Sequence, residues 1–310
     1  MKTLAFVFPG QGSQSVGMLS ELADNFLVVK EVFQEASDTL NIDLWKMCQT
    51  DSDSLNQTIN TQPAMLAAGY ATFKVVKGEI DLHPESFSGH SLGEYSALVA
   101  ADSIEFSDAI KLVRKRAELM QDAVPSGTGG MAAILGLSDE EVINICLNFK
   151  GEGVVEPVNF NSPGQVVVAG SKEAVADICE LMKEAGAKRA VPLQVSVPSH
   201  CSLMNSASDE FAEFINETNI QLPNISVIHN VDALSSNNID QIKQNLIDQI
   251  KKPVLWTQTI SNMSKIGVDR IIECGPGKVL AGLTRRIDKS LSANAIIDKS
   301  SLEETIKEIS

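Results

Sequence analysis

The chain has 310 residues, of which 44% are hydrophobic and 21% charged, the composition of a globular protein with a substantial core. Its formal net charge of −15 argues against nucleic-acid binding, because neutralising phosphates requires a basic surface. The five cysteines are scattered without a Cys-x-x-Cys spacing, so we expect no disulfide framework, no metal site and a cytoplasmic location. The apolar run near the N-terminus stops at Pro9-Gly10, too early for a signal peptide or a membrane span.

The first part of the chain predicts strands alternating with helices. A glycine-rich turn, PGQGSQ, separates the first strand from the first helical pattern. The segments are strands at 3–8 and 86–91, and helices up to about residue 48 and at 62–78, 93–101 and 106–124. This alternation predicts an α/β fold with a mostly parallel sheet covered by helices.

The pattern changes at the loop-rich segment PSGTGG (125–130) and then reads β-α-β-β-α-β, which is typical of a ferredoxin-like subdomain. Its predicted elements are a strand at 131–137, a helix at 138–150, strands at 154–161 and 165–170, a helix at 172–186 and a strand at 189–195. We therefore predict a subdomain at 126–197 inserted into a core made of 1–125 and 198–310. The core resumes with strands at 225–231 and 269–275, and with helices near 239–250 and from about Lys278.

Ser91 stands at the centre of a Gly-x-Ser-x-Gly pattern between an expected strand and an expected helix, the context of a nucleophile elbow. Gly89 and Gly93 would let the two backbones approach closely. The N–H of Leu92, at the start of the helix, has no partner within it and can donate to an oxyanion. Patterns this short also arise by chance, so an ordinary loop before an ordinary helix stays open.

A nucleophilic serine needs a base, and the chain has four histidines. His200 leads, because it follows a strand end and Pro198, where catalytic groups are often held. His229 comes second and is equally compatible with a core position, whereas His83 lies in a polar stretch and His90 points elsewhere at an elbow. No acidic residue stands out to orient the imidazole, so a backbone or side-chain amide carbonyl is the alternative.

Arg116 lies on the inward stripe of the predicted helix at 106–124. Its neighbours three and four positions away are all apolar: Leu112, Val113, Leu119 and Met120. A buried guanidinium needs an anionic partner. That partner is either an internal carboxylate or the carboxylate of a substrate, and the second would select a dicarboxylic acyl group.

Together these segments resemble the malonyl-CoA:acyl carrier protein transacylases of bacterial type II fatty acid synthesis. The resemblance covers essentially the whole chain. It rests on FVFPGQGSQ (6–14), TQPAML (61–66), GHSLGEYSALVA (89–100), VRKRAELMQ (113–121), VNFNSPGQVVVAG (158–170), VPSHCSLM (197–204) and ECGPGKVLAGLTRRI (273–287). The combination of FPGQGSQ with GHSLGEYSAL is highly specific.

The resemblance implies an α/β-hydrolase-like core and transfer of malonyl from malonyl-CoA to acyl carrier protein, without metal or redox cofactor. We expect a monomer, because nothing in the sequence demands an obligate dimer. Ser91 would carry the acyl group and His200 would be its base. The remaining roles would fall to Arg116 for the malonyl carboxylate, to the N–H groups of Gln11 and Leu92 for the oxyanion, and to the main-chain carbonyl of Gln249 for orienting the histidine. CoA and carrier are anionic, so we expect Lys183, Lys188, Arg189, Lys278, Arg285 and Arg286 to supply local positive potential.

Three other functions stay open at this stage. A serine esterase or thioesterase would use the same elbow without needing Arg116. An acyltransferase for another acyl-CoA would need a different acyl pocket, and a carrier-binding subunit with a vestigial site would need no chemistry.

Overall fold

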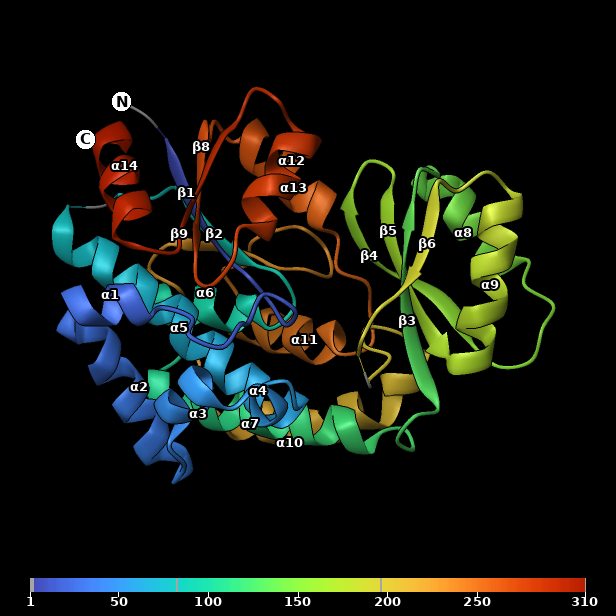
Figure 1. Cartoon of the computed structure of the whole chain (residues 1–310), viewed down its shortest axis with the longest axis horizontal. Helices are drawn as coiled ribbons and strands as arrows, with labels where there is room; N and C mark the ends of the chain where they lie inside the picture. The colour runs from blue at the N-terminus through green and yellow to red at the C-terminus, as the bar shows by residue number, and fades with distance from the viewer. Residues whose placement is uncertain (1–2, 82, 196, 310) are drawn as a thin grey trace.

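The computed structural model describes residues 3–81, 83–195 and 197–309 (Figure 1). A parallel sheet with the order β7-β2-β1-β8-β9 forms the centre of the larger part. Its strands are β1 (Leu4–Phe8), β2 (Ser86–Gly89), β7 (Ser226–Ile228), β8 (Arg270–Cys274) and β9 (Ser292–Ile296). β1 occupies the middle and is buried along its whole length, which explains its continuous apolar sequence.

Helices cover both faces of this sheet, and the side chains of β1 alternate between them. Ala5 and Val7 belong to the cluster formed with α12 (Trp256–Lys265) and α13 (Val279–Ile287). Phe6 and Phe8 belong to the larger cluster on the opposite face. The sheet is therefore the middle of three layers.

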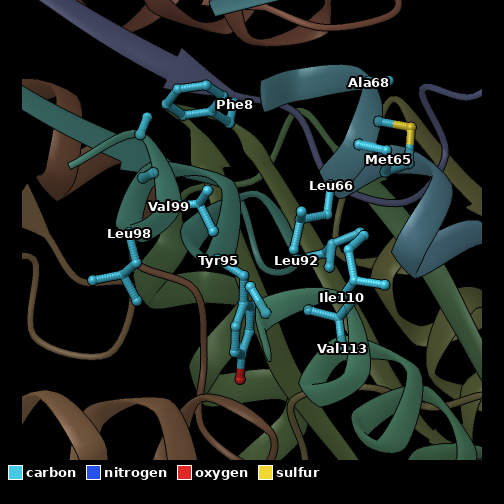
Figure 2. Close-up of a cluster of buried hydrophobic side chains, with 14 of the residues drawn as sticks. Phe8, Met65, Leu66, Ala68, Leu92, Tyr95, Leu98, Val99, Ile110 and Val113 are labelled. Atoms are coloured by element: carbon cyan, nitrogen blue, oxygen red, sulfur yellow. The ribbon is translucent and has the colours of Figure 1, made fainter. Parts of the chain in front are cut away.

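The larger cluster is built by α5 (Thr58–Glu79), α6 (Gly93–Ala100) and α7 (Phe106–Asp122). Figure 2 shows Leu92 beside Leu66 of α5 and Ile110 of α7. All eight residues of α6 are buried, as expected of a helix enclosed by its neighbours. This helix follows Ser91 directly, so the serine turn is anchored in the core.

The other helices surround these layers. α2 packs against α5 and α7, and α10 packs against α7 and α11. The bounds are α1 (Ser20–Asn25), α2 (Leu27–Leu40), α3 (Leu44–Thr50), α4 (Ser52–Leu55), the 3₁₀ helix η1 (Ser202–Met204), α10 (Asn205–Glu217), α11 (Ile239–Gln249) and α14 (Lys299–Ile309). None of the helices in the described part of the chain has the length and apolarity to cross a membrane.

A second, antiparallel sheet with the order β4-β5-β3-β6 lies beside the core, at the right of Figure 1. Its elements are β3 (Gly129–Leu135), α8 (Asp139–Leu147), β4 (Val155–Ser162), β5 (Gln165–Ser171), α9 (Lys172–Glu184) and β6 (Arg189–Pro192). α8 and α9 pack on one face of the sheet, and Met131 and Val167 lie in a separate cluster with Cys201 of the core. β4 also joins the core directly, because Phe160 N–H donates to Val254 O at 3.0 Å and Val254 N–H donates to Val158 O at 2.8 Å.

The predicted fold class, an α/β-hydrolase-like core with a mostly parallel sheet and a ferredoxin-like α+β part, is confirmed. Several boundaries differ from the predictions by up to four residues, including the following three. The strand predicted at 189–195 ends at Pro192, the one at 225–231 shortens to β7, and α5 begins at Thr58 rather than at residue 62. The predictions also did not include β9, α12 and α14 as elements.

The early start of α5 places Pro63 inside the helix, where the missing N–H leaves the carbonyl of Ile59 without its helical donor. Arg114 of α7 donates from Nη1 to that carbonyl at 3.2 Å and to Asn60 Oδ1 at 2.8 Å. A side chain from a neighbouring helix thus satisfies the interrupted turn.

Candidate active site

Ser91 occupies a sharp turn between β2 and α6 with a left-handed backbone φ of 51°. The two flanking glycines make this turn possible. A methyl group at Gly89 would collide with the backbone of Gly93, and one at Gly93 would collide with the carbonyl of Phe8. The sequence therefore forms the strained strand-to-helix turn of a nucleophile elbow.

Asn230, just beyond β7, holds this turn from behind. Its Oδ1 accepts from Ser91 N–H at 2.7 Å, and its Nδ2 donates to Gly89 O at 2.7 Å. The side chain is fully buried, so these bonds form without competition from solvent.

His200 faces Ser91, with His200 Nε2 2.8 Å from Ser91 Oγ. His200 Nδ1 lies 2.6 Å from the main-chain carbonyl of Gln249. A carbonyl oxygen can only accept, so Nδ1 carries the proton and Nε2 is free to accept from the serine hydroxyl. Burial, reinforced by the nearby Arg116 cation, lowers the pKa of His200 to about 3, which keeps the imidazole neutral.

Arg116 of α7 reaches the same point from a position that is 1% exposed. Its Nη2 donates to Ser91 Oγ at 3.2 Å and to Gln249 Oε1 at 2.9 Å, and its Nη1 donates to Gln62 Oε1 at 2.7 Å. None of the salt bridges among the described residues includes this guanidinium, so the internal carboxylate considered from the sequence is not found there. Instead, the guanidinium donates to the neutral oxygens of Gln62, Ser91 and Gln249. The same N–H groups suit a bound carboxylate.

The backbone N–H groups of Gln11 and Leu92 have no acceptor among the described residues. Leu92 is the N-cap residue of α6, and Gln11 lies in the loop after β1. Both residues line the cavity that contains Ser91 and His200. They are therefore available to a ligand oxygen placed above the serine.

This cavity has a volume of about 110 Å³ and lies between the core and the antiparallel sheet. Ser91, Arg116 and His200 form part of its polar side. The apolar side consists of Met120, Met131, Leu193, Val195 and Val197. The arrangement suits a ligand with an apolar arm and a charged end.

Comparison with known proteins shows the family to which the chain belongs. Residues 5–301 match the acyl transferase domain family. Malonyl CoA-acyl carrier protein transacylase of Haemophilus influenzae is 52% identical to this chain, over 97% of each chain. The chain belongs to this family of acyltransferases.

Further relatives are similar to this acyltransferase in sequence and in structure. The transacylase of Escherichia coli strain K12 is 48% identical over 97% of this chain and 98% of its own. The crystal structure of an acyl carrier protein S-malonyltransferase from Vibrio cholerae matches with a TM-score of 0.95 and 52% identity, covering 98% of this chain and all of that one. A structure described as a type II polyketide synthase acyl carrier protein in complex with its malonyl-transacylase matches at a TM-score of 0.97 and 47% identity, covering 99% and 100%.

The other histidines of the acyltransferase have separate partners. His229, the second candidate base, lies 2.7 Å from Glu94 through Nδ1 and is 1% exposed. His90 Nε2 lies 2.8 Å from Asn161 Oδ1, and burial lowers the pKa of that imidazole. His83 is exposed beside Asp81.

The basic residues proposed from the sequence lie away from this cavity, because none is among its lining residues. Lys183 pairs with Glu180 at 2.7 Å, and Arg286 donates to Gln165 at 2.9 Å. Arg285 donates to the carbonyl of Ala293. Their contribution to a docking potential stays a prediction.

Three residues that hold the site together were not among the predicted site residues: Gln62, Glu94 and Asn230. Glu94 carried a usable signal, because it is the one charged residue in the apolar segment GEYSALVAA. Gln62 stands within TQPAML, and its role becomes visible only when α5 and α7 are placed side by side. Asn230 offered no local signal, since its partners are 139 and 141 residues away along the chain.

Proposed function

We propose that this acyltransferase moves the malonyl group from malonyl-CoA to the phosphopantetheine thiol of acyl carrier protein through a malonyl ester on Ser91. The observation that carries the proposal is that Ser91, His200 and Arg116 meet around one hydroxyl oxygen in one cavity. The names of the relatives support the same substrate and acceptor.

In the first half-reaction, His200 Nε2 takes the proton of Ser91 Oγ as that oxygen attacks the thioester carbonyl. The N–H groups of Gln11 and Leu92 receive the oxyanion, and one such donor typically contributes about 2.7–4 kcal/mol. The Gln249 carbonyl, bonded to Nδ1, stabilises the imidazolium that forms. When the intermediate collapses, the carbon–sulfur bond breaks and His200 returns its proton to the departing CoA sulfur.

Arg116 distinguishes the acyl group. Its Nη donors now contact Ser91 Oγ and the side-chain oxygens of Gln62 and Gln249. A carboxylate at the far end of a short acyl chain would replace these neutral oxygens with a charged acceptor, a stronger interaction for a guanidinium that is 1% exposed. A neutral acyl group offers no such replacement.

In the second half-reaction, the carrier thiol enters and His200 takes its proton as the sulfur attacks the ester. The serine oxygen leaves and recovers the proton from His200, which restores the free enzyme. Transfer requires the thiol to outcompete water, and the apolar side of the cavity favours a sheltered ester.

We further propose that the chain consists of a catalytic core, residues 1–125 and 198–310, and an inserted subdomain, residues 126–197. The two sheets have separate clusters of buried side chains, which supports this division. The reaction as written balances without metal or redox cofactor. A monomer in the cytoplasm is part of the proposal, and the five buried free cysteines suit a reducing compartment.

Intact-mass measurement tests the central step. Wild-type protein incubated with malonyl-CoA should gain one malonyl group, and Ser91→Ala should gain none. Addition of carrier protein bearing phosphopantetheine should remove the adduct and yield malonyl-carrier. Rapid loss of the adduct to free malonate without carrier would indicate a thioesterase instead.

A further inference from the structure

Glu94 is a buried carboxylate that the mechanism above does not use. It lies in the first turn of α6 and is 0% exposed. Its Oε1 lies 2.7 Å from His229 Nδ1, and its Oε2 accepts from Asn230 N–H at 3.0 Å and from Gln249 Nε2 at 2.7 Å. A charge so buried is retained at a cost unless it is fully bonded, and these three donors bond it.

Two of these donors belong to residues that hold the reacting groups. The Gln249 side chain donates to Ser91 O at 2.9 Å and accepts from Arg116 Nη2 at 2.9 Å, while its main-chain oxygen contacts His200. Asn230 fixes both ends of the serine turn. Glu94 therefore contacts the residues that hold Ser91, His200 and Arg116, and it acts on these three only through Gln249 and Asn230.

The same connection links two opposite charges. Arg116 is buried, and no carboxylate pairs with it directly among the described residues. The Gln249 amide lies between, with its N–H directed at Glu94 and its oxygen at Arg116. Hydrogen bonds in such a chain polarise one another, so the amide transmits part of the charge. Burial lowers the pKa of Arg116, and the Glu94 carboxylate opposes that shift.

We propose that Glu94 is a positioning residue of the transfer reaction and the resident counter-charge of Arg116, acting through the side-chain amide of Gln249. The inference rests on the proposed function, since it takes Arg116 as the group that binds the acyl carboxylate. The Gln249 amide separates the Glu94 carboxylate from the Arg116 guanidinium. Glu94 therefore keeps the guanidinium charged, while its N–H donors stay free of a bound anion. The substrate carboxylate then competes only with neutral oxygens.

His229 is the other group on Glu94, and its charge decides how much of the carboxylate charge Arg116 receives. A neutral imidazole with the proton on Nδ1 makes the same bond as an imidazolium and leaves the Glu94 charge in place. His229→Asn tests this, because its amide replaces the Nδ1 donor and cannot become charged. We expect its affinity for malonate to stay within twofold of wild type.

The decisive comparison uses Glu94→Gln, which removes the charge and nearly keeps the shape, and Glu94→Asp, which keeps the charge and shortens the side chain. Glu118→Gln, on the exposed side of α7, is the control for net charge. Two quantities are measured on each folded protein: the rate of Ser91 malonylation, and the dissociation constant of free malonate from the rise in melting temperature. Malonate binding needs no turnover, so it tests the counter-charge even where the transfer reaction fails.

For Glu94→Gln we expect malonylation at least tenfold slower, yet malonate bound at least threefold more tightly, because the ligand becomes the counter-ion of Arg116. Glu94→Asp should also be slow, with malonate affinity within twofold of wild type. Malonate binding that is unchanged or weaker in Glu94→Gln would overturn the counter-charge. If Glu94→Gln does not fold, Glu94→Asp decides: malonate affinity falling in parallel with the rate means a purely structural role.

Discussion

Ser91 and His200 both adopt left-handed backbone conformations, with φ of 51° and 68°, and their side chains meet at 2.8 Å. Such a conformation costs a non-glycine residue about 1–3 kcal/mol and persists only where the surroundings impose it. At Ser91 the Asn230 amide imposes it, and at His200 the backbone N–H donates to Ile250 O at 3.0 Å. Two of the six non-glycine residues with a left-handed backbone among the described residues are thus the pair that the proposed mechanism requires to exchange a proton.

Gly93→Ala should destabilise the protein by about 3 kcal/mol and abolish acylation, because the new methyl group meets the rigid carbonyl of Phe8. Chemical denaturation and intact-mass measurement check the two effects. Gly282→Ala is the matched control: it lies within α13 with no atom near its added methyl group. There we expect a gain of about 0.5–1 kcal/mol from helix propensity, and equal destabilisation of the two variants would contradict the steric argument.

Arg116→Ala should lower kcat/KM for malonyl-CoA by about 100-fold or more, because truncating a buried charged partner typically costs 2–5 kcal/mol. Neutral acyl-CoA substrates should lose less, so acetyl should gain relative to malonyl. Competition assays with the two substrates measure this ratio. An equal loss for both would mean that Arg116 supports the fold of the site and does not read the acyl carboxylate.

The rate of Ser91 acylation should not fall near pH 6.5, as it would if the base were a histidine with an ordinary pKa. Burial and the Arg116 cation lower the pKa of His200 to about 3, so the base stays neutral as pH falls through its ordinary value of 6.5. We expect kcat/KM for Ser91 malonylation to stay nearly flat from pH 8 to about pH 5, within twofold. Single-turnover measurement of CoA release gives this profile, and an inflection near 6.5 would count against it.

Glu273 should make the protein less stable as pH rises from 4.5 to 7. Burial raises the pKa of this carboxyl to about 7 from an ordinary 4.5, so the native state binds the proton more tightly than the unfolded chain. Its contribution is full below pH 4.5 and is lost as pH rises through 7, a change of roughly 3 kcal/mol. Glu273→Gln should remove this slope from the free energy of unfolding measured against pH.

Glu141→Gln is the contrasting control for that experiment. The hydrogen bonds from Ser138 in the capping box lower the pKa of Glu141, so its contribution grows as pH rises. Its replacement should therefore alter the slope in the opposite direction. Identical slopes in the two variants would argue against a buried protonated Glu273.

Much of the fold could be predicted because most of its strands and helices carry a local sequence pattern. β1 is continuously apolar, and residues 131–192 follow the βαββαβ order. β9 could not be predicted in this way: it is an edge strand in which only Ala293 and Ile296 are buried. The strand predicted to 195 ends early because Leu193 and Val195 turn to line the cavity.

In the candidate site, too, residues with a local sequence pattern could be predicted and contacts between distant residues could not. Ser91 and Arg116 were visible because a pattern of a few residues marks each of them. The bonds between Glu94 and His229 or Gln249 were not, since they join residues 135 and 155 positions apart. Arg116 was expected to contact a carboxylate, and the amides that it contacts instead depend on the packing of three helices.

The Asn230 amide takes the Ser91 N–H and the Gly89 carbonyl, so among the described residues of the elbow the N–H of Leu92 is the donor left free. In the proposed mechanism the second donor is the N–H of Gln11, in the loop beyond the end of β1, a strand whose last residue, Phe8, pairs with Gly89. A slip of these two strands by one position would shift Gln11 relative to Ser91 and weaken the proposed oxyanion site. Acylation of Ser91 is therefore a sensitive report that the centre of the sheet has assembled in its native register.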